Sequence, residues 1–276
     1  MTGGVSGSWV VRAPWSGREV VVKRTTRSEQ VVLRLFADLH EPSLPELLAS
    51  GADEAGPWVV MPYYDGVSVD IMGELPVAAH CCMGRLHARF AGRTTELADD
   101  LEAIDSELVR RALTEFGPDQ LERARAAIGE ALYARASCLL ADLAHDVDFC
   151  IAVENFSSTL LHGDLYGLNV LQPHGPDGSP MILDWNAARI GPPMFDVAMT
   201  SAYDSPGRRA HDQGWAKITG APPDAGENEL AHAWSTALIN AMYAGTVAIR
   251  STPQDCDLMI TTAEAALQTF RRLRCQ

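Results

Sequence analysis

The sequence predicts an α+β protein in which a small β-rich lobe precedes a large, mainly helical lobe. Short β-rich runs separated by turn residues occupy the chain up to Gly66, whereas the later segments are long and rich in Ala, Leu and Arg. The predicted division is therefore residues 1–66, ending in a hinge, and residues 67–276. A cleft between two lobes is a favoured place for a ligand, so we expect the functional site there.

The first lobe is expected to open with a β-hairpin. Residues 8–13 and 19–23 are β-rich, and the Pro-Trp-Ser-Gly segment between them is a turn signal. A helix should follow, because Ser28 can serve as an N-cap and apolar residues recur at helical spacing until Pro42. Residues 57–61 then form a short buried strand that leads into the predicted hinge.

The second lobe begins with helical patterns. Three helices are predicted, over residues 75–90, 97–116 and 120–143. The expected break between the second and third helices is Gly117-Pro118, because both residue types interrupt helices. Three short strands come next, over residues 158–161, 169–172 and 181–185. From Gln213 onward the chain is expected to be mostly helical, with a loop at 220–226 and a break at Pro253.

The composition argues against several classes of protein. The chain has 276 residues, 22 Lys or Arg and 36 Asp or Glu, and thus a net charge of −14. This acid excess argues against nucleic acid and against an anionic membrane surface as partners. The six cysteines form no C-x-x-C pair and no zinc-binding spacing. The sequence shows neither a signal peptide nor an apolar run long enough to span a membrane, so we expect a cytoplasmic protein with reduced thiols.

The strongest functional signal is Leu-His-Gly-Asp-Leu-Tyr-Gly-Leu-Asn at 161–169, followed by Ile-Leu-Asp-Trp at 182–185. Asp164 follows a predicted strand, Asn169 opens the next strand, and a hairpin should return Asp184 to the same end. Mg²⁺ prefers carboxylate and amide oxygens, so Asp184 and Asn169 are the candidate metal ligands. Asp164 remains to orient a hydroxyl and accept its proton, which is the layout of a kinase catalytic loop. An ordinary turn rich in Asp, Gly and Asn is the alternative.

These motifs resemble those of the aminoglycoside phosphotransferase family, a branch of the protein-kinase-like fold. The similarity extends over residues 3–202. It includes residues 59–66, which resemble the family's hinge, residues 84–88, and residues 191–198, in which Asp196 would support the active site. The resemblance implies a bilobal kinase-like fold and ATP (or GTP) and Mg²⁺ as cofactors. It also implies phosphoryl transfer to a hydroxyl of a small molecule.

The same resemblance implies roles for two charged residues of the first lobe. Lys23 would contact the α- and β-phosphates of the nucleotide, and Glu29 would be its ion-pair partner. A lysine that follows Val20-Val21-Val22 is costly to bury without an anionic partner, which agrees with this role. The alternatives are a lysine that reaches solvent and a first-turn glutamate favoured by the helix dipole.

Two further nucleotide contacts follow from the resemblance. Gly4, Ser6 and Gly7 would form the loop over the phosphates, because glycines let backbone N–H groups approach an anion. A frayed terminal segment is the alternative. At the hinge, the carbonyl of Pro62 and the N–H of Tyr64 would bind adenine, and a proline retains the carbonyl that this role needs.

The sequence departs from the family's pattern at two places. The chain begins almost at the Gly-rich loop, so the first lobe is expected to be trimmed at its start, or to begin further upstream. Asn186 follows Asp184-Trp185 at a position where many relatives carry an acid. A local change of specificity could follow from that exchange.

The distribution of charge bears on the acceptor. Residues 1–90 carry 8 basic and 10 acidic side chains, whereas residues 91–276 carry 14 and 26. An acidic lobe can attract a polycation, which favours an aminoglycoside or another cationic antibiotic, and hence resistance or self-protection. The candidate contacts are Asp196, Tyr203, Asp204, Glu227, Glu229, Asp255, Asp257 and Glu264.

Three alternatives stay open. The acid excess can simply be a solvated surface. The acceptor can be a neutral nucleoside or macrolide antibiotic, or a sugar or amino-alcohol of primary metabolism. A protein of another class, a catalytically inactive ATP-binding regulator, would be marked by loss of a site residue. The residues that would reveal such a loss are all present: Lys23, Asp164, Asn169 and Asp184.

Overall fold

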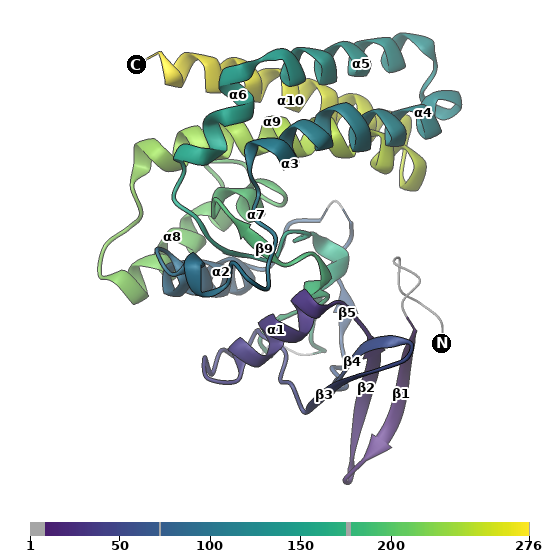
Figure 1. Cartoon of the computed structure of the whole chain (residues 1–276), viewed down its shortest axis with the longest axis vertical. Coiled ribbons are helices and arrows are strands. Elements are labelled where there is room, and N and C mark those ends of the chain that lie inside the picture. Colours follow the sequence, from purple (N-terminus) through teal and green to yellow (C-terminus); the bar gives the residue numbers. More distant parts are fainter. Residues whose placement is uncertain (1–8, 72, 175–177, 276) are drawn as a thin grey trace. The chain divides into compact units, whose positions relative to one another are not determined.

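The computed structural model describes residues 9–71, 73–174 and 178–275 (Figure 1). The chain divides into two compact units. The first unit consists of Met1–Glu102, Thr159–Ile190 and Thr200–Pro222, and the second of Ala103–Ser158, Gly191–Met199 and Pro223–Gln276. Within the described ranges, no helix is both long and apolar enough to cross a membrane. The lobe boundary at Gly66 is a different division of the chain, and it stays a prediction.

The first unit contains a four-stranded antiparallel sheet with strand order β1-β2-β4-β3. Its strands are β1 (Val10–Trp15), β2 (Arg18–Arg24), β3 (Ala49–Asp53) and β4 (Gly56–Pro62). The predicted hairpin is β1–β2, in which Val10 pairs with Lys23. Its two turn residues, Ser16 and Gly17, have φ values of 50° and 81°. Such left-handed pairs match the twist of a tight hairpin.

The strand β3 was not predicted, because its sequence, Ala-Ser-Gly-Ala-Asp, has little intrinsic preference for a strand. It forms because β4 offers a partner, with Ala49 opposite Val60. Gly51 is required at this place, since a Cβ there would lie 2.4 Å from Cζ2 of Trp58. Tertiary packing rather than local sequence therefore determines this strand.

The helix α1 (Arg27–Phe36) follows the sheet strand β2 as predicted, but both predicted ends were wrong. The N-cap is Thr26, whose backbone is extended and whose hydroxyl accepts from the N–H of Glu29 at 3.2 Å. The hydroxyl of Ser28 instead donates to the backbone carbonyl of Asn186. The helix ends at Phe36, whose ring packs against Trp185 with 4.7 Å between ring centres.

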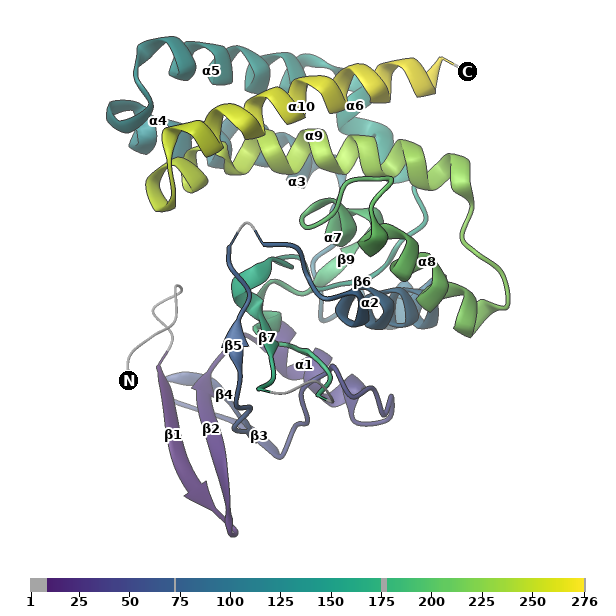
Figure 2. The ribbon, with the colours of Figure 1, turned by 180° about the vertical axis from the view of Figure 1, so that it is seen from behind.

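Two small sheets in the first unit carry the predicted motif. One has strand order β5-β7-β8, with β5 (Val67–Ser68), β7 (Val170–Gln172) and β8 (Met181–Ile182); β5 and β7 lie side by side (Figure 2). The other pairs β6 (Thr159–Leu161) with β9 (Arg189–Gly191). The predicted strands over 158–161 and 169–172 therefore exist, whereas β8 ends three residues before Trp185. Short 3-10 turns follow the motif loops, η4 at Gly167–Asn169 and η5 at Trp185–Ala187.

The remaining helices of the first unit are α2 (Val77–Phe90) and α8 (Pro206–Thr219), with the 3-10 turn η1 at Thr94–Glu96. α2 and α8 pack closely against each other (Figure 2). Glycines permit the close approach: a Cβ on Gly84 would lie 1.9 Å from the carbonyl oxygen of His211, and one on Gly214 would lie 2.1 Å from that of Cys81.

The second unit is helical. Its elements are α3 (Ser106–Arg111), the π-helical turn η2 (Ala112–Phe116), α4 (Gly117–Ile128), α5 (Glu130–His145), α6 (Val147–Ile151), η3 (Ala152–Asn155), α7 (Met194–Ala198), α9 (Ala225–Arg250) and α10 (Pro253–Arg274). The predicted helix over 97–116 begins only at Ser106. The loop predicted at 220–226 and the break at Pro253 lie next to the ends of α9.

The predicted break at Gly117-Pro118 was wrong. Helical backbone continues from α3 through η2 into α4, so Pro118 lies within a continuous helical stretch, directly after the π-helical turn. A proline there lacks the N–H of one helical hydrogen bond, and a π-helical turn is one of the irregularities by which a helix accommodates such a loss. The break lies at Gly129, whose φ of 79° separates α4 from α5. An L side chain rarely adopts that conformation, so glycine ends the helix there.

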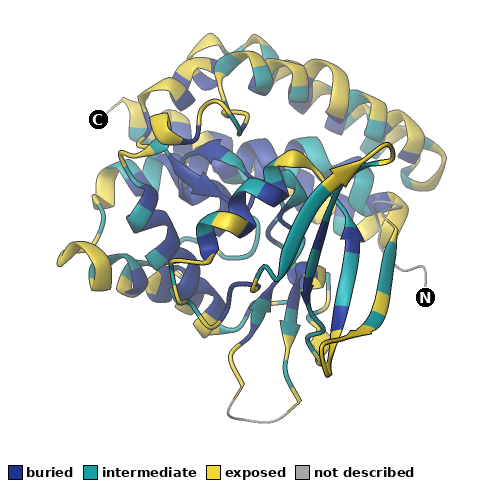
Figure 3. Cartoon of the chain, turned by 60° about the horizontal axis from the view of Figure 1, so that its bottom comes forward, coloured by how far each residue is buried: buried dark blue, intermediate teal, exposed yellow. Residues whose placement is uncertain are grey.

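Each unit has its own apolar core (Figure 3). In the second unit, the indole N–H of Trp234 donates to the carbonyl of Phe149 at 2.8 Å, and the Phe149 ring packs edge-on against Phe270. In the first unit, Trp185 is fully buried and its indole N–H donates to the carbonyl of Ile182 at 3.0 Å. The core of the first unit therefore anchors the residue that follows Asp184.

Candidate active site

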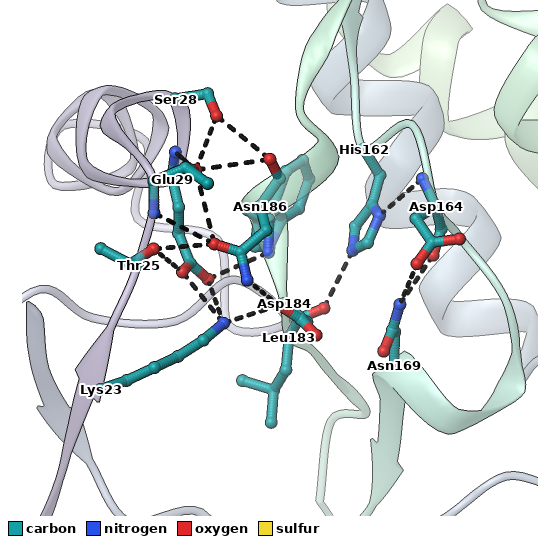
Figure 4. Close-up of polar contacts among 12 residues, drawn as sticks. Lys23, Thr25, Ser28, Glu29, His162, Asp164, Asn169, Leu183, Asp184 and Asn186 are labelled. Carbon is teal, nitrogen blue, oxygen red and sulfur yellow. Dashed lines mark hydrogen bonds and ion pairs between the residues drawn. The ribbon is translucent and has the colours of Figure 1, made fainter. Parts of the chain in front are cut away.

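The predicted partners Lys23 and Glu29 lie together in the first unit, and Asp184 joins them (Figure 4). The Nζ of Lys23, at the buried end of β2, lies 3.1 Å from Oε1 and 3.0 Å from Oε2 of Glu29. It lies 2.6 Å from Oδ1 of Asp184. The side chains of Lys23 and Glu29 are only 9% and 1% exposed, so this lysine does not reach solvent but is held by two carboxylates.

Glu29 accepts more than one hydrogen bond. Besides Lys23, its carboxylate receives the backbone N–H of Trp185 at 3.1 Å and the hydroxyl of Thr25. A buried carboxylate needs several donors, and here they come from β2, from Thr25 between β2 and α1, and from the backbone of the residue after Asp184. Glu29 therefore ties the β2–α1 region to the segment that carries Asp184.

Asp184 lies between β8 and the turn η5 in an uncommon backbone conformation. Its φ is 65° and its ψ is 62°, in the left-handed region. For a residue other than glycine this costs on the order of 1 kcal/mol, and such conformations cluster at functional sites. The side chain is 37% exposed, so the carboxylate combines a buried lysine on one side with access to solvent.

The loop between β6 and η4 holds Asp164. Its backbone N–H donates to Nδ1 of His162 at 3.3 Å, and Nε2 of the same ring lies 2.9 Å from the carbonyl oxygen of Leu183. A carbonyl can only accept, so Nε2 carries the proton and Nδ1 is the acceptor. The buried ring of His162 thus connects the Asp164 loop to the residue that precedes Asp184.

Asn169 is fixed by the same loop. Its Nδ2 donates to the backbone carbonyl of Asp164 at 2.8 Å and lies 3.4 Å from Oδ2 of that residue. Its backbone carbonyl accepts from the N–H of Leu183 at 2.8 Å. These bonds orient the amide, so that Nδ2 faces Asp164 and Oδ1 is the atom left for a ligand.

Two glycines are required by the geometry of this loop. Gly163 has a φ of 79°, and a Cβ there would lie 2.1 Å from the carbonyl oxygen of Ala187. A Cβ on Gly167 would lie 1.9 Å from the carbonyl oxygen of Asp70. The loop therefore needs glycine both for its backbone conformation and for the close approach of neighbouring chain segments.

The residues present fit a magnesium ion. Asp184 offers a partly exposed carboxylate and Asn169 an amide oxygen whose nitrogen is engaged, and Mg²⁺ prefers hard oxygen ligands of this kind. Within the described ranges, no group of three or more His, Cys, Asp or Glu side chains could hold a metal ion. Two protein ligands agree with the usual Mg²⁺ site of kinases, in which phosphates and water supply the rest.

The predicted hinge begins at the end of β4. The N–H of Tyr63 donates to the carbonyl of Glu19 at 3.0 Å, and Pro62 lies opposite Val20. Since hydrogen-bonded and non-bonded pairs alternate in an antiparallel ladder, the Pro62 carbonyl points away from β2. The hydroxyl of Tyr64 accepts from the N–H of Glu46 at 2.7 Å, and burial raises the pKa of this tyrosine. Gly4, Ser6 and Gly7 lie outside the described residues.

The candidate acceptor contacts are divided between the two units. In the first unit, the ring of Tyr203 lies under the guanidinium of Arg208 at 4.5 Å, and the backbone carbonyl of Asp204 accepts from Arg209. In the second unit, Asp196 is fully buried in α7, and Glu227 and Glu229 lie at the start of α9. The assignment of these residues to the acceptor stays a prediction.

Several of the acidic residues near the C-terminus already have partners. Arg135 of α5 pairs with Asp257 at 2.7 Å and with Glu264 at 2.5 Å, both on α10. Asp255 accepts from the hydroxyls of Ser251 and Thr252, which lowers the pKa of its carboxyl. Some of the acidic side chains of residues 91–276 are therefore engaged in local contacts within the second unit.

The sequence indicated no role for His162 or Thr25 and suggested only a local change of specificity at Asn186. All three contact the predicted site residues. The sequence showed His162 only as a member of the 161–169 motif and indicated none of its contacts. Thr25 and Asn186 contact each other across 161 positions of the chain, so no local pattern could connect them. The one available signal was the acid that the family resemblance leads one to expect in place of Asn186.

The family of the chain is shown by its sequence. A model of the phosphotransferase enzyme family matches residues 2–232, and the chain therefore belongs to this family. The predicted resemblance is confirmed, and the protein is a small-molecule phosphotransferase that acts on hydroxyl groups. No protein among those curated for function matches the chain significantly.

Solved structures confirm the predicted kinase-like α+β fold. A putative aminoglycoside phosphotransferase from Ralstonia eutropha is 15% identical, with 96% of this chain and 93% of that chain covered and a TM-score of 0.58. A macrolide 2′-phosphotransferase from Brachybacterium faecium is 22% identical, with 95% and 88% covered and a TM-score of 0.50. A spectinomycin phosphotransferase, solved with ADP and spectinomycin, is 12% identical, with 97% and 89% covered and a TM-score of 0.51.

Proposed function

We propose that this protein transfers the γ-phosphoryl group of ATP (or GTP) to a hydroxyl of a cationic antibiotic, in a reaction that requires Mg²⁺. The observation that carries the proposal is the connected group around Lys23. Its amine lies 2.6 Å from Asp184, and the His162 ring links the residue before Asp184 to the loop of Asp164. Phosphoryl transfer depends on positioning and charge stabilisation, and this group supplies both.

Each residue has one role in the proposed reaction. Lys23, held by Glu29, binds the α- and β-phosphates. Asp184 and Asn169 hold Mg²⁺, which neutralises charge on the phosphates. Asp164 orients the acceptor hydroxyl and takes its proton as the new oxygen–phosphorus bond forms and the bond from the γ-phosphorus to the β-γ bridging oxygen breaks. At the hinge, the Pro62 carbonyl and the Tyr64 N–H bind adenine.

The preference for a cationic acceptor rests on charge. Residues 91–276 hold 26 of the 36 acidic side chains and 14 of the 22 basic ones. Structures of proteins named for aminoglycosides and spectinomycin share the fold. One fold neighbour is named for a macrolide, so a largely neutral antibiotic is the second candidate. Asp196, Tyr203, Asp204, Glu227 and Glu229 remain the proposed acceptor contacts.

The acceptor can be identified by ADP release. Purified protein with ATP and Mg²⁺ is tested against aminoglycosides, spectinomycin, macrolides, a cationic cyclic peptide, nucleoside antibiotics and small amino-alcohols. We expect one cationic class to raise ADP release well above the rate without acceptor, and expression of the protein to protect a sensitive host from that class. If nucleotide binds but no acceptor raises ADP release, the regulator alternative gains and the proposed enzyme function fails.

A further inference from the structure

Asn186 joins two segments that are far apart in the sequence (Figure 4). Its side-chain Nδ2 donates to Oδ1 of Asp184 at 2.6 Å. Its side-chain Oδ1 accepts from the backbone N–H of Thr26 at 3.3 Å and lies 2.9 Å from the hydroxyl of Thr25. Its backbone carbonyl accepts from the hydroxyl of Ser28 at 3.1 Å. Asn186 is therefore bonded both to the predicted metal ligand and to the residues that lead into α1.

The chemistry of the partners determines which way the amide faces. The carboxylate of Asp184 only accepts hydrogen bonds, and the backbone N–H of Thr26 only donates one. The nitrogen of the amide must therefore face Asp184 and its oxygen must face Thr26. An aspartate would lack the donor, and an alanine would lack both groups. The hydroxyl of Thr25 has a single proton, which the oxygen of Asn186 and the carboxylate of Glu29 share.

The carboxylate of Asp184 is held at one oxygen only. Oδ1 receives both Lys23 and Asn186, each at 2.6 Å. Oδ2 receives no hydrogen bond from the residues that the structure describes. The Lys23 amine also contacts Glu29 and, in the proposed function, the phosphates of the nucleotide. Its hydrogen bonds are therefore shared among several acceptors, and Asp184 is only one of them. Among the residues that the structure describes, the amide nitrogen of Asn186 donates only to Asp184, so its bond to Oδ1 does not have to be shared when a nucleotide is present.

We propose that Asn186 is a positioning residue that orients the carboxylate of Asp184 for Mg²⁺ by tying it to the start of α1, and that it thereby determines the affinity for the magnesium–nucleotide complex. This inference rests on the proposed function, because it needs a nucleotide and Mg²⁺ at this site. It goes beyond the residues that the family motif contributes, since Asn186 is not one of them.

The test compares nucleotide affinity with and without metal. The dissociation constant of ADP is measured by calorimetry in Mg²⁺ and in excess chelator. The value in chelator divided by the value in Mg²⁺ gives the factor by which the metal strengthens ADP binding, here called the metal ratio. Residues that orient a metal ligand typically contribute about tenfold or more to metal affinity. We expect Asn186→Ala and Asn186→Leu to reduce the ratio about tenfold while the affinity for ADP in chelator stays within about twofold of the original. Asn186→Leu nearly preserves side-chain volume, so a cavity cannot explain a shared loss.

A matched control separates positioning from general stability. Gln30 is a buried amide on α1, next to Glu29, and its Nε2 donates to the carbonyls of Gly51 and Trp58 at 2.6 Å and 2.8 Å. Gln30→Ala should lower the melting temperature and leave the metal ratio unchanged. The inference is wrong if both Asn186 variants keep the ratio within about twofold, or if Gln30→Ala reduces it equally. If the unchanged protein binds no nucleotide, the proposed function fails instead.

Discussion

Two clusters of buried polar side chains lie in the first unit. One contains a buried histidine that is neutral near pH 7, and the other contains a lysine ion-paired with two carboxylates. Between α2 and α8, Nδ1 of His87 lies 2.9 Å from Nε2 of His211, and both rings are fully buried. Burial lowers the pKa of His211 to about 4, so the ring is neutral near pH 7. The cluster of Lys23, Glu29 and Asp184 instead keeps buried charges, at a place where one carboxylate reaches solvent.

We interpret the first cluster as part of the packing between α2 and α8 and the second as part of a functional site. The neutral ring of His211 calls for no counterion, which suits a tight helix–helix contact. One lysine between two carboxylates has an excess negative charge, and a partly exposed carboxylate can take up a cation. An ion-paired cluster that is buried except at one partly exposed carboxylate is typical of a binding site for a charged ligand. The predictions below test this distinction, from the largest expected effect to the smallest.

The largest effect is expected for Asp164→Asn. This change removes the group that accepts the proton of the acceptor hydroxyl and keeps the size of the side chain. General-base groups contribute roughly 10²- to 10⁴-fold, so kcat should fall by about that factor. The dissociation constant of ADP with Mg²⁺ should stay nearly unchanged. Steady-state ADP release with a true acceptor gives kcat, and a variant with full kcat would contradict the assignment of Asp164.

Lys23→Met tests the charged cluster directly. Loss of a positioned donor on the phosphates should lower kcat/KM by roughly 10²- to 10³-fold. It also leaves Glu29 buried without its lysine, and breaking a buried ion pair typically costs about 3–5 kcal/mol of folding free energy. Urea unfolding followed by circular dichroism measures this loss.

The double variant Lys23→Met, Glu29→Gln is the control for that experiment. Removing the orphaned charge should restore much of the stability and none of the activity, because the phosphate contact is still missing. If the double variant regains kcat/KM, Lys23 acts only through the fold. Such a result would make the two polar clusters alike and remove the distinction between them.

The sequence predicted the parts of the site that depend on local spacing. Asp164, Asn169 and Asp184 lie within a loop and a hairpin, so their order along the chain was enough to bring them together. Lys23 and Glu29 are six residues apart and end on neighbouring elements, β2 and α1. The sequence suggested a change of specificity at Asn186 but not its contacts, because its partners Thr25 and Thr26 are brought to it by packing of α1 against η5 and not by any local pattern.

The errors in the fold have a similar cause. The hairpin β1–β2 was predicted because β-rich runs flank a clear turn. The strand β3 was missed because only its pairing with β4 makes Ala-Ser-Gly-Ala-Asp extended. The helix break was placed at Pro118, although the π-helical turn η2 carries the helical backbone past this residue. The true break at Gly129 depends on a positive φ that residue periodicity does not reveal.

Two buried histidines, His80 on α2 and His211 on α8, predict a pH dependence of stability. Burial lowers the pKa of both His80 and His211 to about 4 from 6.5. Between these values the unfolded chain binds protons that the folded chain does not, so stability falls as the pH falls from about 6.5 toward 4. His211 faces His87, Asp212 and Arg208, and burial outweighs the opposing effect of Asp212.

Urea unfolding at several pH values measures this loss. His80→Leu should reduce the difference in stability between pH 7 and pH 4.5, because one titrating group is gone. His174→Ala, at a side chain that is 63% exposed, is the control and should leave the difference unchanged. An unchanged pH dependence in His80→Leu would contradict the lowered pKa that burial gives the His80 ring.

The smallest effect is expected for Ser201→Ala. The hydroxyl of Ser201 lies 3.1 Å from Nε2 of His80, which is the neutral counterpart of the 2.6 Å contact between Lys23 and Asp184. Losing one neutral hydrogen bond costs about 1 kcal/mol of unfolding free energy, and no charge is left unpaired. We expect that loss in urea unfolding at pH 7 and no change in kcat. A fall in kcat would show that the contact between Ser201 and His80 of α2 also positions reacting groups. A neutral buried contact of this kind would then have a role in catalysis as well as in packing.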